Sequence, residues 1–199
     1  DIFSFEFEQP VIEEPESISP IAQYLPLKLY FHNDEPDCCT MSVTTDKTYK
    51  DAYISYFKME EEYNLYSPNS AVFFEDSLKG NFNKLKRIFS HILTDLKLGK
   101  KIQLHVKGFS SPLHKKEYNI NLSKRRIQSF VNYLRLYDNM LFSPFLNSGF
   151  LQIIELPLGE SKSIKEVSDN PNDRLNSIYS LDAILERRIE IIDIKLIDE

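Results

Sequence analysis

The stretch IQLHVKGFSSPLHKKEYNINLSKRRIQSFVNYLRLY, residues 102–137, decides the fold that we expect for this chain. Its first part alternates apolar residues with polar ones, which is the period of a half-buried β-strand. Gly108 is expected to end that strand. The later part carries an apolar stripe at helical spacing, formed by Leu122, Ile127, Phe130, Val131 and Leu134. The stretch therefore predicts a strand, a polar turn and an amphipathic helix.

The turn and the start of the helix contain the first candidate binding residues. Three of them follow the strand, at a place where a rigid scaffold can hold a loop against a ligand: Phe109, Ser110 and Ser111. Arg126 lies beside the apolar stripe, one turn into a helix that we expect to open at residues 119–123. Free backbone N–H groups and a two-pronged guanidinium would there favour a carboxylate. The alternative is that Arg126 pairs with an acid such as Asp34 or Glu117, and spacing alone does not separate the two.

The composition describes a chain that can bury a full core. It has 199 residues, of which 42% are hydrophobic, with 14 Phe and 11 Tyr, and we expect one domain. The formal net charge is -6. A general nucleic-acid binder needs a broad basic face to neutralise phosphates, so we expect no nucleic-acid partner. No apolar run approaches the roughly 20 residues that span a bilayer, so we expect no membrane span in this chain.

The sequence contains no motif typical of an enzyme or a metal site. It lacks a P-loop, a dinucleotide-binding glycine motif, HExxH and GxSxG. The histidines lack metal-ligand spacing, and Ser110 and Ser111 have no defined base, so we expect no metal, no cofactor and no catalysis. The only cysteines, Cys38 and Cys39, are neighbours, and a disulfide between neighbouring residues strains the intervening peptide. We expect two free thiols or one intermolecular disulfide.

The other segments predict the remaining elements. Residues 1–24 are acidic and rich in proline, which is typical of an extended linker. We expect strands at residues 25–31, 150–156 and 189–197, helices at 44–66, 72–98 and 180–187, a loop at 138–149, and a surface excursion from Gly159. The order of strand, helices, strand, helix, strand, helix, strand predicts α+β or α/β layering with helices against one sheet.

Three separated motifs resemble those of the peptidoglycan-binding OmpA-like domain. The family's signature runs from a glycine through Tyr-Asn, Leu-Ser and an arginine, and the matching positions are Gly108, Tyr118, Asn119, Leu122, Ser123, Arg125 and Arg126. Tyr30 and Phe31, followed by Asn33 and Asp34, resemble the end of its first strand, and residues 186–190 resemble its closing motif. The resemblance covers residues 25–199, with insertions at about 38–69 and 159–179.

The resemblance implies an α+β fold, a βαβαβ sandwich in which helices pack on one mixed sheet, with an inserted helix and a long loop. It implies noncovalent binding of the diaminopimelate of the peptidoglycan stem peptide, with Arg126 on the ligand carboxylate. The other implied binding positions are Phe109, Ser110, Ser111, Asn33, Asp34, Asn119, Leu122 and Arg188. Ser111 stands where the family usually has an aspartate for the ligand ammonium, and losing such a contact costs roughly 1 to 3 kcal/mol. Asp34 or Glu117 could substitute for that acid.

The stretches ELPLGE and LERRIEI are similar to OmpA-like domains that end multidomain proteins of the Bacteroidetes, including a lipoprotein of the type IX secretion system. This similarity implies a periplasmic location, with attachment to the outer membrane through upstream parts of a longer protein. It also implies other secretion-system or outer-membrane proteins as partners. The competing expectation is a protein-interaction module of an envelope complex that has lost wall binding, and Ser111 and the two aromatic-rich insertions favour it.

Overall fold

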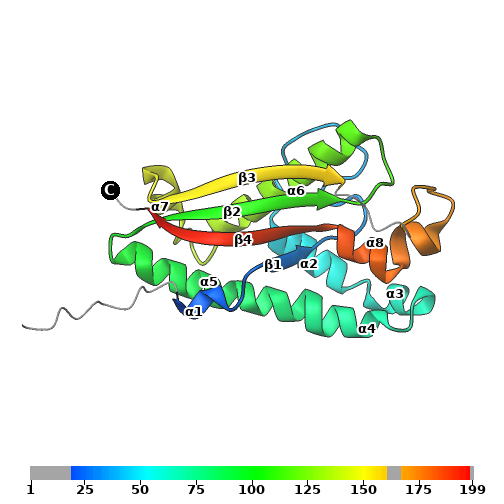
Figure 1. Cartoon of the computed structure of the whole chain (residues 1–199), viewed down its shortest axis with the longest axis horizontal. Helices are drawn as coiled ribbons and strands as arrows, with labels where there is room; N and C mark the ends of the chain where they lie inside the picture. Colours follow the sequence, from blue (N-terminus) through cyan, green and yellow to red (C-terminus); the bar gives the residue numbers. More distant parts are fainter. Residues whose placement is uncertain (1–18, 161–166, 198–199) are drawn as a thin grey trace, which may run out of the picture.

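The computed structural model describes residues 19–160 and 167–197, which form one mixed sheet and a layer of helices (Figure 1). The sheet has the order β1-β4-β2-β3, in which β4 is antiparallel to both of its neighbours and β2 is parallel to β3. Its strands are β1 (Leu27–Tyr30), β2 (Lys101–Ser110), β3 (Leu151–Glu160) and β4 (Arg188–Ile197). The α+β class is therefore confirmed, and the four strands occur along the chain in the predicted succession.

Long helices cover the sheet, and short ones fill the connections between strands. The helices are α1 (Ser19–Ala22), α2 (Tyr49–Phe57), α3 (Glu60–Tyr66), α4 (Ser70–Val72), the π-helix η1 (Phe73–Lys79), α5 (Gly80–Lys97), α6 (Lys116–Leu136), α7 (Ser143–Ser148), the π-helix η2 (Leu175–Tyr179) and α8 (Leu181–Glu186). Ser180 caps α8 by accepting a hydrogen bond from the backbone N–H of Ala183, which confirms the predicted helix start. No helix within the described residues is long and apolar enough to cross a membrane.

The core lies between the sheet and helices α5 and α6. Alternate residues of β2 point into it, including Leu104 and Val106, and they meet the apolar stripes of both helices. The helix α6 passes behind β2 and β3 in Figure 1. Gly108 lies where this packing is tightest, because a Cβ there would come 2.7 Å from the carbonyl oxygen of Ser123. The predicted strand end at Gly108 is wrong, since close approach of α6, not a turn, requires glycine at this position and β2 runs on to Ser110.

Three other predicted boundaries need correction. Residues 44–66 form two helices instead of one, because the chain leaves the helical path at Lys58 and Met59. The predicted loop at 138–149 contains α7. Residues 19–22, at the end of the predicted linker, form α1, and Ile21 is buried in the core. The rest of that linker and residues 161–166 of the second insertion lie outside the described residues.

The two insertions pack against each other in a second hydrophobic cluster. Its rings include Tyr56 and Tyr63 from the first insertion, Phe74 from η1, and Tyr179 from the second insertion. Tyr63 makes edge contacts with Phe74 and Tyr179 at centroid distances of 5.5 and 5.0 Å. The aromatic residues of the first insertion therefore pack within their own domain, and the second insertion is not only a surface excursion.

Candidate functional site

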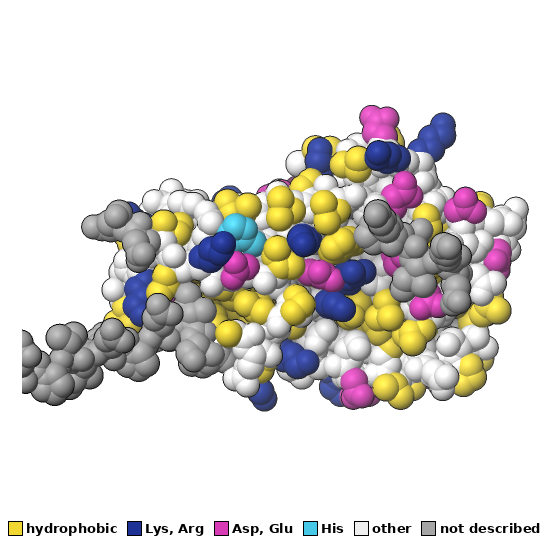
Figure 2. Space-filling view, viewed as in Figure 1, with side chains coloured by type: hydrophobic (Ala, Val, Ile, Leu, Met, Phe, Trp, Pro, Cys, Tyr) yellow, Lys and Arg dark blue, Asp and Glu magenta, His cyan; other side chains and the backbone are white. Residues whose placement is uncertain are grey.

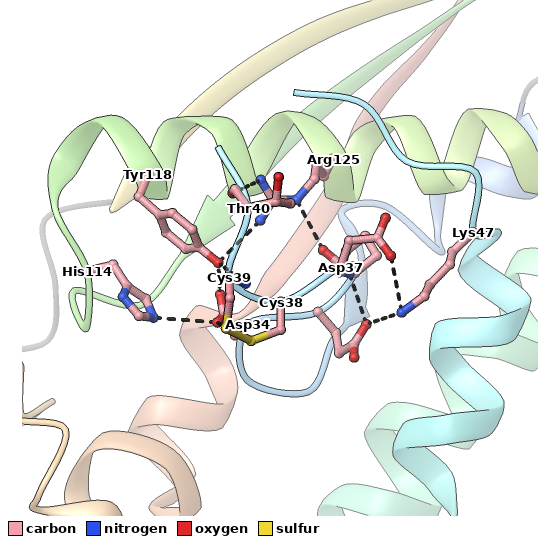
Figure 3. Close-up of a disulfide and its surroundings, with 11 residues drawn as sticks. Asp34, Asp37, Cys38, Cys39, Thr40, Lys47, His114, Tyr118 and Arg125 are labelled. Atoms are coloured by element: carbon pink, nitrogen blue, oxygen red, sulfur yellow. Dashed lines mark hydrogen bonds and ion pairs between the residues drawn. A yellow bond between two sulfur atoms is a disulfide. The ribbon is translucent and has the colours of Figure 1, made fainter. Parts of the chain in front are cut away.

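The candidate site lies at the end of β2, where three segments meet. These are the loop that follows β1 (residues 31–48), the turn that follows β2 (residues 111–115), and the first turns of α6 (Figure 3). A register shift between Gly108 and Phe109 re-aims the end of β2, and the carbonyl of Phe109 meets α6 there. The site is thus assembled from residues more than seventy positions apart in the sequence.

Arg126 is completely buried beneath the loop that follows β1. Its guanidinium donates hydrogen bonds to three backbone carbonyls, those of Glu35 at 2.9 Å, Phe109 at 2.7 Å and His32 at 3.4 Å. Burial, the largest cause, and the nearby positive charge of Arg187 lower the pKa of Arg126 to about 9, and Asp34 opposes this shift. Arg126 therefore remains charged at neutral pH, and its charge is near that of Asp34.

Arg125, the other arginine of the motif, is also completely buried. It donates to the carbonyls of Pro36 at 3.1 Å, Thr40 at 3.0 Å and Ser42 at 2.6 Å. Its guanidinium also lies 5.4 Å from the centre of the Tyr118 ring. Neighbouring arginines of α6 thus hold consecutive parts of one loop, and Arg125 fixes the first insertion over the helix. No residue type marks this role in the sequence, because the acceptors are backbone carbonyls.

Asp34 is the acid of this site. Its side chain is nearly buried, and its backbone is left-handed with φ of 59°. The Tyr118 hydroxyl donates to Oδ1, while Oδ2 lies 3.8 Å from Nε2 of His114 (Figure 3). Burial raises the pKa of Tyr118, and the hydrogen bond to Asp34 raises it further, so this hydroxyl keeps its proton as a donor. Tyr118 therefore fixes one carboxylate oxygen of Asp34, and the other is directed toward His114.

The helix start does not contribute the free N–H groups that we expected near Arg126. The helix α6 begins at Lys116, and the backbone N–H of Asn119 already donates to the carbonyl of Lys115. Arg126 is consequently in the middle of the helix, where backbone donors bond within the helix. The prediction that helix N–H groups and the guanidinium converge is therefore wrong. The helix start was misplaced because its N-cap residue, Lys115, makes no side-chain capping hydrogen bond and is not a typical capping residue.

The remaining predicted residues lie around Arg126 and Asp34 at different depths. Ser110 donates its hydroxyl to the carbonyl of Asn119 at 3.2 Å, and Ser111 and Leu122 are buried beside it. The amide nitrogen of Asn119 donates to the carbonyl of His114, while its buried Oδ1 has no hydrogen-bond partner. Asn33 is partly exposed in the loop that contains Asp34.

Arg188 lies on the far side of Phe109. Its guanidinium is 4.4 Å from the centre of the Phe109 ring, and it pairs with Glu190 at 2.7 Å. It also donates to the carbonyl of Leu185 at 2.6 Å. Arg188 therefore contacts the predicted site through the Phe109 ring.

The neighbouring cysteines form a disulfide with each other, which corrects the expectation of free thiols. Both are exposed at the tip of the loop, and Cys39 has a left-handed backbone with φ of 67°. The backbone N–H of Cys39 donates to the Tyr118 hydroxyl at 3.1 Å. The bond between the two sulfur atoms is accommodated because the loop at this point is held by α6 and turns sharply.

A pocket of about 290 Å³ opens next to Asp34, lined by Met41, His114, Lys115, Glu117 and Tyr118. It offers an apolar surface with charged groups at its border. A small ligand in it could contact His114 and Tyr118, which both lie against the Asp34 carboxylate. The arrangement can therefore bind a cationic group directly, whereas an anionic group would have to approach Arg126 through the loop that covers it.

Comparison with known proteins gives no relative: no protein-family model, no curated protein and no solved structure matches this chain.

Proposed function

We propose that this domain binds the stem peptide of peptidoglycan noncovalently and without catalysis, through the zwitterionic end of diaminopimelate. In this proposal it anchors an outer-membrane or secretion-system complex to the cell wall from the periplasm. The observation that carries the proposal is that Arg126 holds the loop that contains Asp34, through the carbonyls of His32 and Glu35 on either side of it. Two opposite charges lie near each other there, and the hydrogen bonds of Arg126 are made to backbone carbonyls instead of to the acid.

Asp34 supplies the negative charge that the ligand ammonium requires. It lies in the loop after β1, whereas Ser111, at the position where an acid was expected, is an uncharged buried residue of the turn after β2. The Tyr118 hydroxyl and the His114 ring both contact Asp34 and also line the pocket of about 290 Å³, and Oδ2 is the Asp34 oxygen on the His114 side. A charge-assisted hydrogen bond to an ammonium would form at that oxygen.

Arg126 supplies the positive charge for the ligand carboxylate. Its three carbonyl acceptors belong to the loop after β1 and to Phe109, so a carboxylate would replace the carbonyls of residues 32–35. A carboxylate forms stronger hydrogen bonds with a guanidinium than a neutral carbonyl does. We therefore expect the loop to shift when the ligand binds.

The test is cosedimentation of the purified chain with diaminopimelate-type peptidoglycan. Asp34→Asn keeps the acceptor for Tyr118 but removes the charge, and we expect it to weaken binding roughly tenfold to a hundredfold. Arg126→Ala should abolish sedimentation. The matched control is Asp37→Asn in the same loop, whose carboxylate faces Lys47 and Thr45, and it should bind as the parent does.

Thermal melting of each variant separates loss of binding from loss of folding, which matters for the buried Arg126. Full binding by a folded Asp34→Asn variant would overturn the assignment of the acid. Released muropeptides in the supernatant would contradict the absence of catalysis.

A second candidate function is a protein-interaction module that has lost wall binding. The observation that favours it is that backbone carbonyls already satisfy both Arg125 and Arg126, so the loop is closed over the cations. Absence of NMR shift changes on adding soluble stem peptide, together with copurification of one envelope protein, would support this alternative and contradict the first.

A further inference from the structure

Three potential metal ligands meet at the exposed tip of the loop after β1, and a fourth, His114, lies beside one of them. The sulfur atoms of Cys38 and Cys39 and a carboxylate oxygen of Asp34 all lie within 4.8 Å of one another. Nε2 of His114 approaches the same carboxylate oxygen, Oδ2, from the turn after β2 (Figure 3). Spacing in the sequence hides this set, because His114 is far from the cysteines along the chain.

The distances from Oδ2 of Asp34 to the other three atoms are close to those of a tetrahedral zinc site, and the exposed His114 ring would turn toward the sulfur atoms to complete it. Ligand atoms at 2.0 to 2.3 Å from a zinc ion in tetrahedral geometry are about 3.3 to 3.8 Å apart. Here Oδ2 of Asp34 is 3.0 Å from Sγ of Cys38, 3.8 Å from Sγ of Cys39 and 3.8 Å from Nε2 of His114. Because the two cysteines are bonded to each other, their sulfur atoms lie on the same side of the loop, as two ligands of one ion must.

The contact between Asp34 and the sulfur atoms is unfavourable as it stands. A sulfur atom in a disulfide has no proton to donate, so the carboxylate faces two electron-rich atoms. A thiol proton or a metal ion between them would convert this contact into an attractive one. The Tyr118 hydroxyl already holds Oδ1, which leaves Oδ2 oriented toward the sulfur atoms and His114, as an outer-shell hydrogen bond orients a metal ligand.

We propose that the reduced form of this chain binds one Zn²⁺ through Sγ of Cys38, Sγ of Cys39, Oδ2 of Asp34 and Nε2 of His114. A dithiol reductant breaks the sulfur–sulfur bond by giving two electrons and two protons, and it becomes a disulfide itself. Each cysteine thiol then loses its proton to solvent as a zinc–sulfur bond forms. The oxidised form lacks thiolates, so metal binding depends on the redox state of the loop.

The ligand set selects the class of metal. Two thiolates, an imidazole and a carboxylate suit a borderline-soft ion such as Zn²⁺, whereas Mg²⁺ and Ca²⁺ prefer oxygen ligands. Both cysteines and His114 are exposed, so an ion can enter from solvent. Arg125, whose guanidinium lies 5.4 Å from the centre of the Tyr118 ring, partly offsets the negative charge of the ligands.

The test is a Zn²⁺ titration of the whole chain before and after reduction with a phosphine that is then removed. We expect one Zn²⁺ per reduced chain, measured by competition with a chromogenic chelator, and none for the oxidised chain. Co²⁺ in place of Zn²⁺ should give the charge-transfer absorption of cobalt–thiolate bonds and the intense visible bands of a tetrahedral ion.

Variants assign the ligands. His114→Ala should weaken Zn²⁺ binding by at least about tenfold, since losing a direct ligand costs no less than losing an outer-shell partner. Cys39→Ser should remove the cobalt–thiolate signature of the pair, and His91→Ala, which changes an exposed histidine of α5, should change nothing. Thermal melting confirms that each variant folds. Failure of the reduced chain to bind Zn²⁺, or unchanged affinity in folded His114→Ala, would overturn the proposal, and neither result bears on peptidoglycan binding by the oxidised chain.

Discussion

The two hydrophobic clusters of this domain are built from different chemistry. The cluster between the sheet and helices α5 and α6 is mainly aliphatic residues and phenylalanine, such as Leu104 and Phe130. The cluster between the insertions is mainly tyrosine and phenylalanine, and polar groups are buried beside it. Nδ1 of His32 is 2.8 Å from the Tyr63 hydroxyl, and buried Arg187 donates to that hydroxyl at 3.3 Å.

The difference indicates that the two clusters contribute to stability with different dependence on pH. Burial of apolar groups is insensitive to pH, so the stability that comes from the apolar residues of the sheet core is the same at neutral and acid pH. A cluster flanked by a partly buried histidine and a buried cation responds to protonation. The same cluster is linked to the candidate site, because the carbonyl of His32 accepts a hydrogen bond from Arg126.

The largest expected effect is that of removing a ring from the sheet core. Phe130→Ala deletes a fully buried ring, and we expect it to lower the free energy of unfolding by about 3 to 5 kcal/mol, as such changes do in other cores. Denaturant unfolding measures it. Phe145→Ala, at a partly exposed position on α7, is the control and should cost clearly less. Equal losses in the two variants would contradict the placement of the main core.

The sequence predicted the sheet core well because its elements have regular periods. Alternation in β2 and the stripe of α6 are local patterns, and each depends only on which side of an element faces the core. The break between α2 and α3 was missed because residues 58 and 59 are compatible with a helix. The aromatic cluster was not predicted either, since it depends on two insertions meeting in space.

The candidate site could be predicted only in part. The motif positions placed both Arg126 and Asp34 in the predicted site, and in the structure Arg126 bonds to the carbonyls of His32 and Glu35 in the loop that contains Asp34. The partners of Arg126 are backbone carbonyls, which every residue has, so no residue type marked them. A disulfide between Cys38 and Cys39 was not expected, because a bond between neighbouring residues strains the intervening peptide. The loop that contains it is held by Arg125 through backbone carbonyls, and the sequence does not reveal these contacts.

An intermediate effect is expected from the buried cation of the aromatic cluster. Arg187→Met leaves the carbonyl of Ile178 and the Tyr63 hydroxyl without this donor, and we expect a loss of about 2 kcal/mol in the free energy of unfolding. Denaturant unfolding at neutral pH measures it. The control is Arg174→Met, since Arg174 is exposed and contacts only the border of the cluster through Tyr179. A loss no larger than that of the control would mean that Arg187 is dispensable for this cluster.

The smallest effect at neutral pH is expected for His32, and it should grow in acid. Burial, the largest cause, and the positive charges of Arg187 and Arg126 together lower the pKa of His32 to about 3. In the unfolded chain a histidine has a pKa of about 6.5, so the unfolded state takes up the proton first. The stability that depends on neutral His32 is therefore complete above about pH 6.5 and is lost as the pH falls toward 3.

Replacing this histidine should remove part of that acid sensitivity. His32→Gln keeps a polar side chain near Tyr63 but does not titrate, so its free energy of unfolding should fall less between pH 7 and pH 5 than that of the parent chain. The comparison uses urea unfolding at both pH values, with His91→Gln on the exposed face of α5 as the control that keeps the parent's pH dependence. If His32→Gln and the parent lose stability equally, His32 is not buried in its neutral form. The contrast between the two clusters would then rest on Arg187 alone.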